Sequence, residues 1–141
     1  ADSIDYYHLK ANAPKITMTV NDGTKETVYD SLYVRSYLDV KDKYSSFTGS
    51  NQPIITIDTS VDNGKSLLIV KDSYAHSLVP FLANHYSKIT MVDMRYINAD
   101  LNEIFKMYGY QPVEEYSQIL FMYNALGFSS EASVRKIMLT K

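Results

Sequence analysis

The sequence lacks several features that would point to a specific chemistry. It has no cysteine, which excludes disulfides and thiolate metal sites. Its five glycines are isolated from one another, so no glycine-rich loop is present to cradle a phosphate, and no cluster of metal-ligand residues is visible either. No apolar run approaches the roughly 18 residues of a membrane-spanning helix. The fourteen Lys and Arg residues are scattered and the net charge is −2, so we expect neither a cofactor, a metal nor a nucleic-acid partner.

What the chain does have is typical of a globular domain. Its 141 residues are enough for one domain with a real core, and 45% of them are hydrophobic. Thirteen tyrosines with no tryptophan is an unusual balance, although a tyrosine usually packs its ring against other side chains and exposes its hydroxyl to solvent. The chain begins with Ala rather than Met, which indicates that it is processed or cut from something longer. We expect a single domain made of a β-rich lead-in (1–42), a βαβ core (43–124) and a C-terminal helix (125–141).

The most informative stretch predicts a βαβ unit. An apolar run at 67–70 precedes a helical segment, and a second apolar run follows at 89–92. Strand, helix and strand within about thirty residues indicate two parallel strands, and ligands bind beyond the carboxyl ends of such strands. Polar residues follow both runs: Asp72, Ser73, Asp93 and Arg95.

Other segments carry recognisable patterns. We predict strands at 15–20, 26–29, 54–58 and 118–123, and helices at 100–108 and 131–138, the latter capped by Ser130. The first two strands form a hairpin across the turn at 21–23, and 127–130 is predicted as loop. Two alternatives stay open. Residues 30–40 form a short helix or an irregular strand, and the helix after the first core strand begins at Ser77 or begins at Ser73 and kinks at Pro80.

Ser73 lies where a serine can act as a nucleophile. A sharp turn after a buried parallel strand exposes its hydroxyl, and the N–H groups of the turn can stabilise an oxyanion. The alternative is that Ser73 only caps a turn. A serine also needs a general base, usually a histidine. His76 is too near in sequence and is interpreted as a residue of the surface or just behind the site, His85 ends a helix, and His8 lies in the lead-in, so no triad can be assembled.

Several residues could accompany Ser73. Asp93 and Arg95 form an ion pair or cap a strand, or Arg95 binds an anionic or acyl oxygen of a substrate. Asn51 and Asn124 could donate side-chain N–H groups to an oxyanion, although asparagine is also common in loops for its local hydrogen bonds. The Ser73 N–H itself is a further oxyanion donor.

More than half of the chain resembles the DHHW family of bacterial envelope proteins. The matching pieces are KYSSF (43–47), GSNQP (49–53), GKSLLIVKDSY (64–74), PFL (80–82), HY (85–86) and VDMRY (92–96). The family is similar to the SGNH hydrolases and to alginate O-acetylation proteins. The resemblance implies an α/β fold of three layers around a parallel, SGNH- or flavodoxin-like sheet, incomplete in this chain. It also implies acyl-ester chemistry, with the serine of Asp72-Ser73 as nucleophile.

Two departures from the family qualify that expectation. The Asp-x-His pair that supplies the base lies upstream of the serine, within the motif that names the family, and the segment 5–8 (DYYH) has the wrong spacing for it. The glycine common before Asp-Ser in the wider superfamily is Lys71 here. The chain is therefore expected to be the C-terminal portion of a larger protein, carrying the nucleophile without its base.

Together these observations predict part of an exported bacterial enzyme, an O-acetyltransferase or esterase acting on cell-envelope polysaccharide. The expected site is Ser73 with Asp72, Asn51, Arg95 and Asn124 as oxyanion- or substrate-binding residues, and the isolated chain is expected to be inactive. The expected partners are a polysaccharide or acyl-ester substrate, and either a second copy or the upstream part of the same protein. The alternative is a non-catalytic surface domain that binds glycan or an envelope partner; a flavodoxin-like cofactor binder is disfavoured without a phosphate loop.

Overall fold

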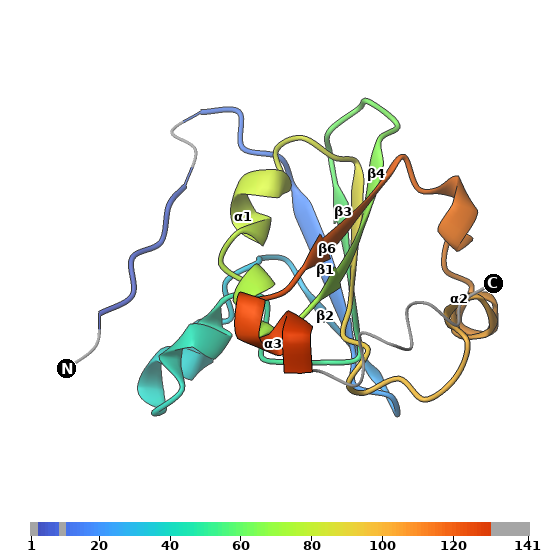
Figure 1. Cartoon of the computed structure of the whole chain (residues 1–141). Helices are drawn as coiled ribbons and strands as arrows, with labels where there is room; N and C mark the ends of the chain where they lie inside the picture. Colours follow the sequence, from blue (N-terminus) through green and yellow to red (C-terminus); the bar gives the residue numbers. More distant parts are fainter. Residues whose placement is uncertain (1–2, 9–10, 131–141) are drawn as a thin grey trace.

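A six-stranded mixed sheet with strand order β2-β1-β3-β5-β4-β6 forms the centre of the computed structural model, which describes residues 3–8 and 11–130 (Figure 1). The strands are β1 (Ile16–Asn21), β2 (Glu26–Tyr29), β3 (Ile54–Thr59), β4 (Ser66–Lys71), β5 (Lys88–Val92) and β6 (Gln118–Met122). The α-helices are α1 (Val79–Leu82), α2 (Leu101–Tyr108) and α3 (Ala125–Ser130), and the 3-10 helices are η1 (Arg35–Asp39), η2 (Lys43–Ser46), η3 (Ser73–Ala75) and η4 (Val113–Glu115).

The direction of the strands divides the sheet into two parts. β4 pairs in parallel with both β5 and β6, which confirms the predicted βαβ unit. β3 pairs antiparallel with β5 and with β1, so the sheet is mixed and the expectation of a parallel sheet is wrong for this half. The reason is the short connection at 60–65, because parallel strands need a crossover of about a dozen residues or more and a tight turn reverses the chain.

The N-terminal hairpin forms as predicted. β1 and β2 pair antiparallel from Met18 opposite Tyr29 to Asn21 opposite Glu26. Asn21 closes the turn because its Oδ1 accepts a hydrogen bond of 2.9 Å from the N–H of Gly23, which has a φ of +92°. A glycine is suited to this backbone conformation because it has no Cβ to clash.

Helices cover both faces of the sheet. α1 and α2 lie on opposite sides of the sheet in Figure 1. Val79 and Ala83 of the α1 region pack with residues such as Ile69, while Leu101 and Phe105 of α2 pack with residues such as Leu68. Successive residues of β4 thus point to opposite cores, and burial of each such side chain contributes roughly 1.5–3 kcal/mol. This double burial holds the carboxyl end of β4, where the predicted site begins, in a fixed position.

The helices differ from the predictions in their bounds. The chain after β4 makes the 3-10 turn η3 and then the short helix α1 with Pro80 in its first turn, so neither predicted start, at Ser73 or at Ser77, is the start of the α-helix. The segment 30–40 contains the 3-10 helix η1 rather than a strand. The predicted loop at 127–130 belongs to α3, and the predicted helix at 131–138 lies outside the described residues.

Helix α2 begins at a capping residue, and β6 is an edge strand. Asp100 caps α2 by accepting from the N–H groups of Asn102 at 2.8 Å and Glu103 at 3.3 Å, as the predicted helix at 100–108 requires. β6 lies at one edge of the sheet and exposes about half of the Ile119 and Phe121 surfaces. In the described part of the chain, no helix is long and apolar enough to cross a membrane.

Candidate functional site

Ser73 begins the turn η3 directly beyond the buried strand β4. Its neighbour Asp72 caps the turn, since the Asp72 carboxylate accepts a hydrogen bond of 2.9 Å from the Tyr74 N–H. Ser73 is partly exposed, whereas the residues before it are buried. Among the residues that the structure describes, none forms a hydrogen bond with the Ser73 hydroxyl. The turn therefore presents a hydroxyl that is accessible and that no described base activates.

The Asp72 carboxylate also ties β4 to the end of β6. Its Oδ2 accepts two hydrogen bonds from Asn124, one from the backbone N–H and one from Nδ2, both of 2.8 Å. The Asp72 N–H donates to the Met122 carbonyl at 3.1 Å, and Asp72 is only 3% exposed. Asn124 in turn begins α3, because its Oδ1 accepts from the Gly127 N–H at 2.7 Å. The contacts of Asp72 and Asn124 thus fix the position of Ser73, and one amide hydrogen of Asn124 is already committed to Asp72.

A second carboxylate, Asp93, lies at the end of the adjacent strand β5 and is paired with two cations. Arg95 donates from Nε to Oδ1 at 2.8 Å and from Nη2 to Oδ2 at 2.6 Å, in a bidentate arrangement. Lys71, the last residue of β4, places its Nζ 3.3 Å from the same Oδ2. The side chains of Lys71 and Asp93 are both 0% exposed. A buried charge is tolerated only when it is paired and hydrogen-bonded, and these contacts supply both.

His76 completes this buried network. Its Nε2 lies 2.9 Å from Lys71 Nζ and 3.1 Å from Asn51 Oδ1, and its Nδ1 is hydrogen-bonded with Thr48 Oγ1. Asn51 Oδ1 also accepts from Lys71 Nζ at 3.5 Å. Because His76 is 2% exposed, the prediction of a surface residue is wrong, and the alternative of a residue just behind the site agrees with its position. Both ring nitrogens are engaged, so His76 is not placed to accept a proton from Ser73.

The electrostatics of the network follow from its burial. Burial lowers the pKa of Lys71, with Asp93 acting in the opposite direction. Burial, and then the Lys71 charge, lower the pKa of His76 to about 3, so the imidazole is neutral at neutral pH. Burial alone would raise the pKa of Asp93, but the Arg95 hydrogen bonds and the Lys71 charge lower it below its usual value. The network therefore contains an ionised Asp93 and a neutral His76.

The predicted site residues thus fall into two groups. Asp72 and Asn124 surround the Ser73 turn, whereas Asn51 and Arg95 belong to the network around Asp93. The structure contains the ion pair between Asp93 and Arg95, which is one of the roles predicted for these two residues. Sequence reasoning missed Lys71, although a signal existed: alternation along β4 places Lys71 on the same face as the buried Leu67 and Ile69.

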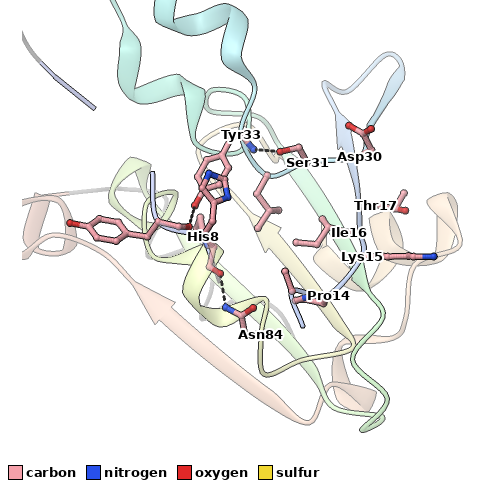
Figure 2. A pocket seen from close by; sticks show the side chains of 13 residues that line it. His8, Pro14, Lys15, Ile16, Thr17, Asp30, Ser31, Tyr33 and Asn84 are labelled. Carbon is pink, nitrogen blue, oxygen red and sulfur yellow. Dashed lines mark hydrogen bonds between the residues drawn. The ribbon is translucent and has the colours of Figure 1, made fainter. Parts of the chain in front are cut away.

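A separate hollow of about 490 Å³ lies at the start of β1. Figure 2 shows it between the hairpin region, Asn84 and the lead-in residue His8, whose ring lies 5.1 Å from that of Tyr33. Ser73 is not among its lining residues, so this hollow is not part of the Ser73 site. No group of three or more His, Asp or Glu side chains that could hold a metal ion occurs in the described residues.

Comparisons with known proteins give structural neighbours only. No family model matches the sequence, and no curated protein matches it significantly. A DHHW family protein from Eubacterium siraeum DSM 15702 is similar in structure, with a TM-score of 0.62 and 25% identity over 90% of this chain and 40% of that chain. PatB1 of Bacillus cereus, solved without and with a sulfonyl adduct, gives TM-scores of 0.61 and 0.60 at 21% identity over 83% of this chain and 38% of theirs.

These likenesses support the resemblance to the DHHW family noted in the sequence, and they show an α/β fold shared with the Bacillus protein. The chain spans about 40% of the length of the DHHW protein and slightly less of the others.

Proposed function

We propose that this chain carries the nucleophile of an exported bacterial enzyme of DHHW type that cleaves or transfers acyl esters on cell-envelope polysaccharide. The observation that carries the proposal is the Ser73 turn. A partly exposed serine follows a strand that is buried on both faces, and the carboxylate of Asp72 fixes the turn through hydrogen bonds from Tyr74 and Asn124. The loose structural likeness to a DHHW protein and to PatB1 is compatible with this function.

In the proposed reaction the Ser73 Oγ bonds to the acyl carbon while a base outside the described residues takes its proton. The carbonyl oxygen becomes an oxyanion, and the Ser73 N–H, at the first position of η3, is without a partner inside that helix and can donate to it. The C–O bond to the donor alcohol then breaks, and the base returns the proton to that alcohol. In the second step the base takes the proton of an acceptor hydroxyl or of water, whose oxygen bonds to the acyl carbon. The bond between that carbon and Ser73 Oγ then breaks, and the base returns the proton to Ser73 Oγ.

The Lys71 network has a positioning role in this proposal. Glycine is common at the position of Lys71 in the wider superfamily, and the structure accommodates the longer side chain because it extends inward to Asp93 and His76. This contact joins the end of β4, from which the Ser73 turn continues, to the end of β5. Arg95 contributes by holding Asp93, rather than by binding the substrate through the same N–H groups.

Asn51 and Asn124, predicted as oxyanion donors, also have structural contacts. Asn124 Nδ2 donates to Asp72, and Asn51 Oδ1 faces Lys71 and His76. We therefore propose that the Ser73 N–H is the principal hydrogen-bond donor to the oxyanion. The two asparagines have a smaller part in stabilising it.

The test is covalent labelling of Ser73 with a fluorophosphonate probe. The isolated chain and a longer version that includes the upstream region are compared, each with a Ser73→Ala variant. Ser36→Ala, which removes an exposed hydroxyl of η1, is the matched control. We expect labelling of the longer version only, lost in Ser73→Ala and kept in Ser36→Ala. A sulfonyl fluoride is a suitable second probe, because PatB1 is known with a sulfonyl adduct.

Two results would contradict the proposal. Strong labelling of the isolated chain at Ser73 would show that the base lies within it. Absence of labelling in both versions with both probes would favour the alternative of a non-catalytic domain that binds glycan or an envelope partner.

A further inference from the structure

The sheet face that packs against α2 changes character along the strands. Near the carboxyl ends of β4 and β5 it is apolar, and Val70 and Val92 are buried beneath Leu101 and Phe105 of α2. Near the opposite ends the same face carries hydroxyls and charges, and a hollow of about 260 Å³ opens there. We call this hollow the tyrosine-walled groove, because Tyr108, Tyr110 and Tyr116 are among its lining residues.

The floor of the groove consists of two rows of side chains across the sheet. Thr19, Thr56 and Thr90 stand directly opposite one another on β1, β3 and β5. In the next row, Asp58 pairs with Lys88 at 2.7 Å. The first row presents hydroxyl groups, and the second presents an ion pair whose charges offset each other.

The walls are aromatic and fixed in position. Gly109 ends α2 with a φ of +70°, and the reversal of the chain there brings the rings of Tyr108 and Tyr110 together, stacked with centroids 5.7 Å apart. Tyr110 donates to Glu26 Oε1 at 2.8 Å and accepts from Asn21 Nδ2 at 3.1 Å, and Tyr116 donates to Thr90 Oγ1 at 2.7 Å. These bonds hold the ring of Tyr110 against the side of the groove and that of Tyr116 against its floor.

Part of the hydrogen-bonding capacity of the groove is unused. Within residues 3–8 and 11–130 no protein group bonds to the hydroxyls of Thr19, Thr56 or Tyr108. Aromatic faces beside free hydroxyl groups suit a ligand that has both an apolar face and several hydroxyls. The carboxylate of Glu26 is already hydrogen-bonded and the Asp58–Lys88 charges cancel, so the ligand needs no net charge.

We propose that the tyrosine-walled groove binds a neutral saccharide unit. Its volume lies just below the 300–1,000 Å³ typical of small-molecule pockets, which fits one sugar ring rather than a long segment. The groove lies at the amino end of β5, whereas Ser73 follows the carboxyl end of β4, so the two sites are at opposite ends of the sheet. The inference therefore does not depend on a catalytic role for Ser73.

The test is saturation-transfer difference NMR on the 141-residue chain, with glucose and N-acetylglucosamine as neutral probes and glucuronate as the charged one. We expect at least one neutral sugar to bind in the millimolar range. Tyr108→Ala should weaken it by about tenfold, because the wall loses an aromatic face. Thr56→Val, which removes a hydroxyl and keeps the shape, should weaken it by a smaller factor. Tyr74→Ala, at an exposed tyrosine beside Ser73, is the control and should leave binding unchanged.

Several outcomes would overturn the inference. The first is the absence of a transfer signal with either neutral sugar at tens of millimolar. The second is an equal affinity in the wild type, Tyr108→Ala and Thr56→Val. The third is tighter binding of glucuronate than of the neutral sugars. Loss of binding in Tyr74→Ala would also overturn it, by moving the sugar to the other end of the sheet. Ser73→Ala should have no effect here, which separates this test from the labelling experiment.

Discussion

Asp72 and Asp93 follow two neighbouring parallel strands, and both are buried, yet their surroundings differ. In the described part of the chain, Asp72 accepts its hydrogen bonds from neutral donors, the N–H of Tyr74 and two N–H groups of Asn124. Asp93 is neutralised by two cations, Arg95 and the fully buried Lys71. The first carboxylate therefore serves to position a turn, and the second serves to compensate charge.

Two carboxylates that are equally buried can therefore have different roles. A carboxylate held by neutral donors can lose its charge and keep part of its geometry. A carboxylate that faces buried cations cannot, because its loss leaves those cations uncompensated.

The largest effect is expected for Asp93→Asn. It leaves Lys71 in the interior without its counter-ion, which costs about 3–5 kcal/mol of the free energy of unfolding. Urea denaturation measures the loss. Adding Lys71→Met to Asp93→Asn should recover part of it, because the unpaired charge is then gone. A double variant as unstable as Asp93→Asn alone would contradict the role assigned to Asp93.

Asp72→Asn should lower the free energy of unfolding by a smaller amount, about 1–3 kcal/mol. The charge-assisted hydrogen bonds from Asn124 weaken, but a side-chain oxygen remains to accept them. The same substitution should slow probe labelling of Ser73 in the longer version of the protein, since the turn is less well held. Asp62→Asn, at an exposed position of the turn before β4, is the control. Unchanged labelling with the full loss of stability would show that Asp72 has a structural role only.

His76 should make the free energy of unfolding depend on pH. Its pKa falls from 6.5 in the unfolded chain to about 3 in the fold, so the folded state excludes a proton that the unfolded state binds. Stability is therefore complete above pH 6.5 and is lost as the pH falls toward 3, by at most about 1.4 kcal/mol per pH unit.

The measurement is denaturation between pH 6.5 and pH 5, above the main range of carboxylate titration. His76→Gln should flatten this dependence, whereas His85→Gln, at an exposed histidine after α1, should keep it. If the stability of His76→Gln still depends on pH in this range, groups other than His76 cause the dependence.

The smallest effect is expected for Asp58→Asn. Asp58 pairs with Lys88 at 2.7 Å, but its side chain is 54% exposed, so water replaces most of the lost interaction. Surface ion pairs contribute at most about 1 kcal/mol. Denaturation of Asp58→Asn beside Asp93→Asn therefore compares an exposed and a buried aspartate directly, and a loss of several kcal/mol in Asp58→Asn would contradict the comparison.

The sequence predicted best where one principle dominated. The apolar runs of β4 and β5 lie between turn residues, and their parallel pairing follows from the segment between them. The sequence was a poorer guide to elements whose bounds depend on contacts between distant residues. The start of α3 depends on Asn124, which also bonds to Asp72 across the sheet, and Gly127 in isolation suggested a loop.

Two features of the site were predictable only in part. The short connection at 60–65 implies that β3 runs opposite to β4, whereas the family resemblance implies a parallel sheet. The burial of Lys71 was implied by alternation along β4, but a lysine is almost never fully buried unless it is paired. Its partners Asp93 and His76 come from other segments, and their contact with Lys71 is visible only in the folded chain.

The bond between Asp72 and Asn124 joins residues 52 positions apart in the chain. Contacts between distant segments form late in folding because closing a long loop costs entropy before any contact stabilises it, whereas the β1–β2 hairpin is local. We therefore expect the Ser73 turn to reach its final position only after β6 has joined the sheet. Loss of that bond should therefore accelerate unfolding more than it slows folding.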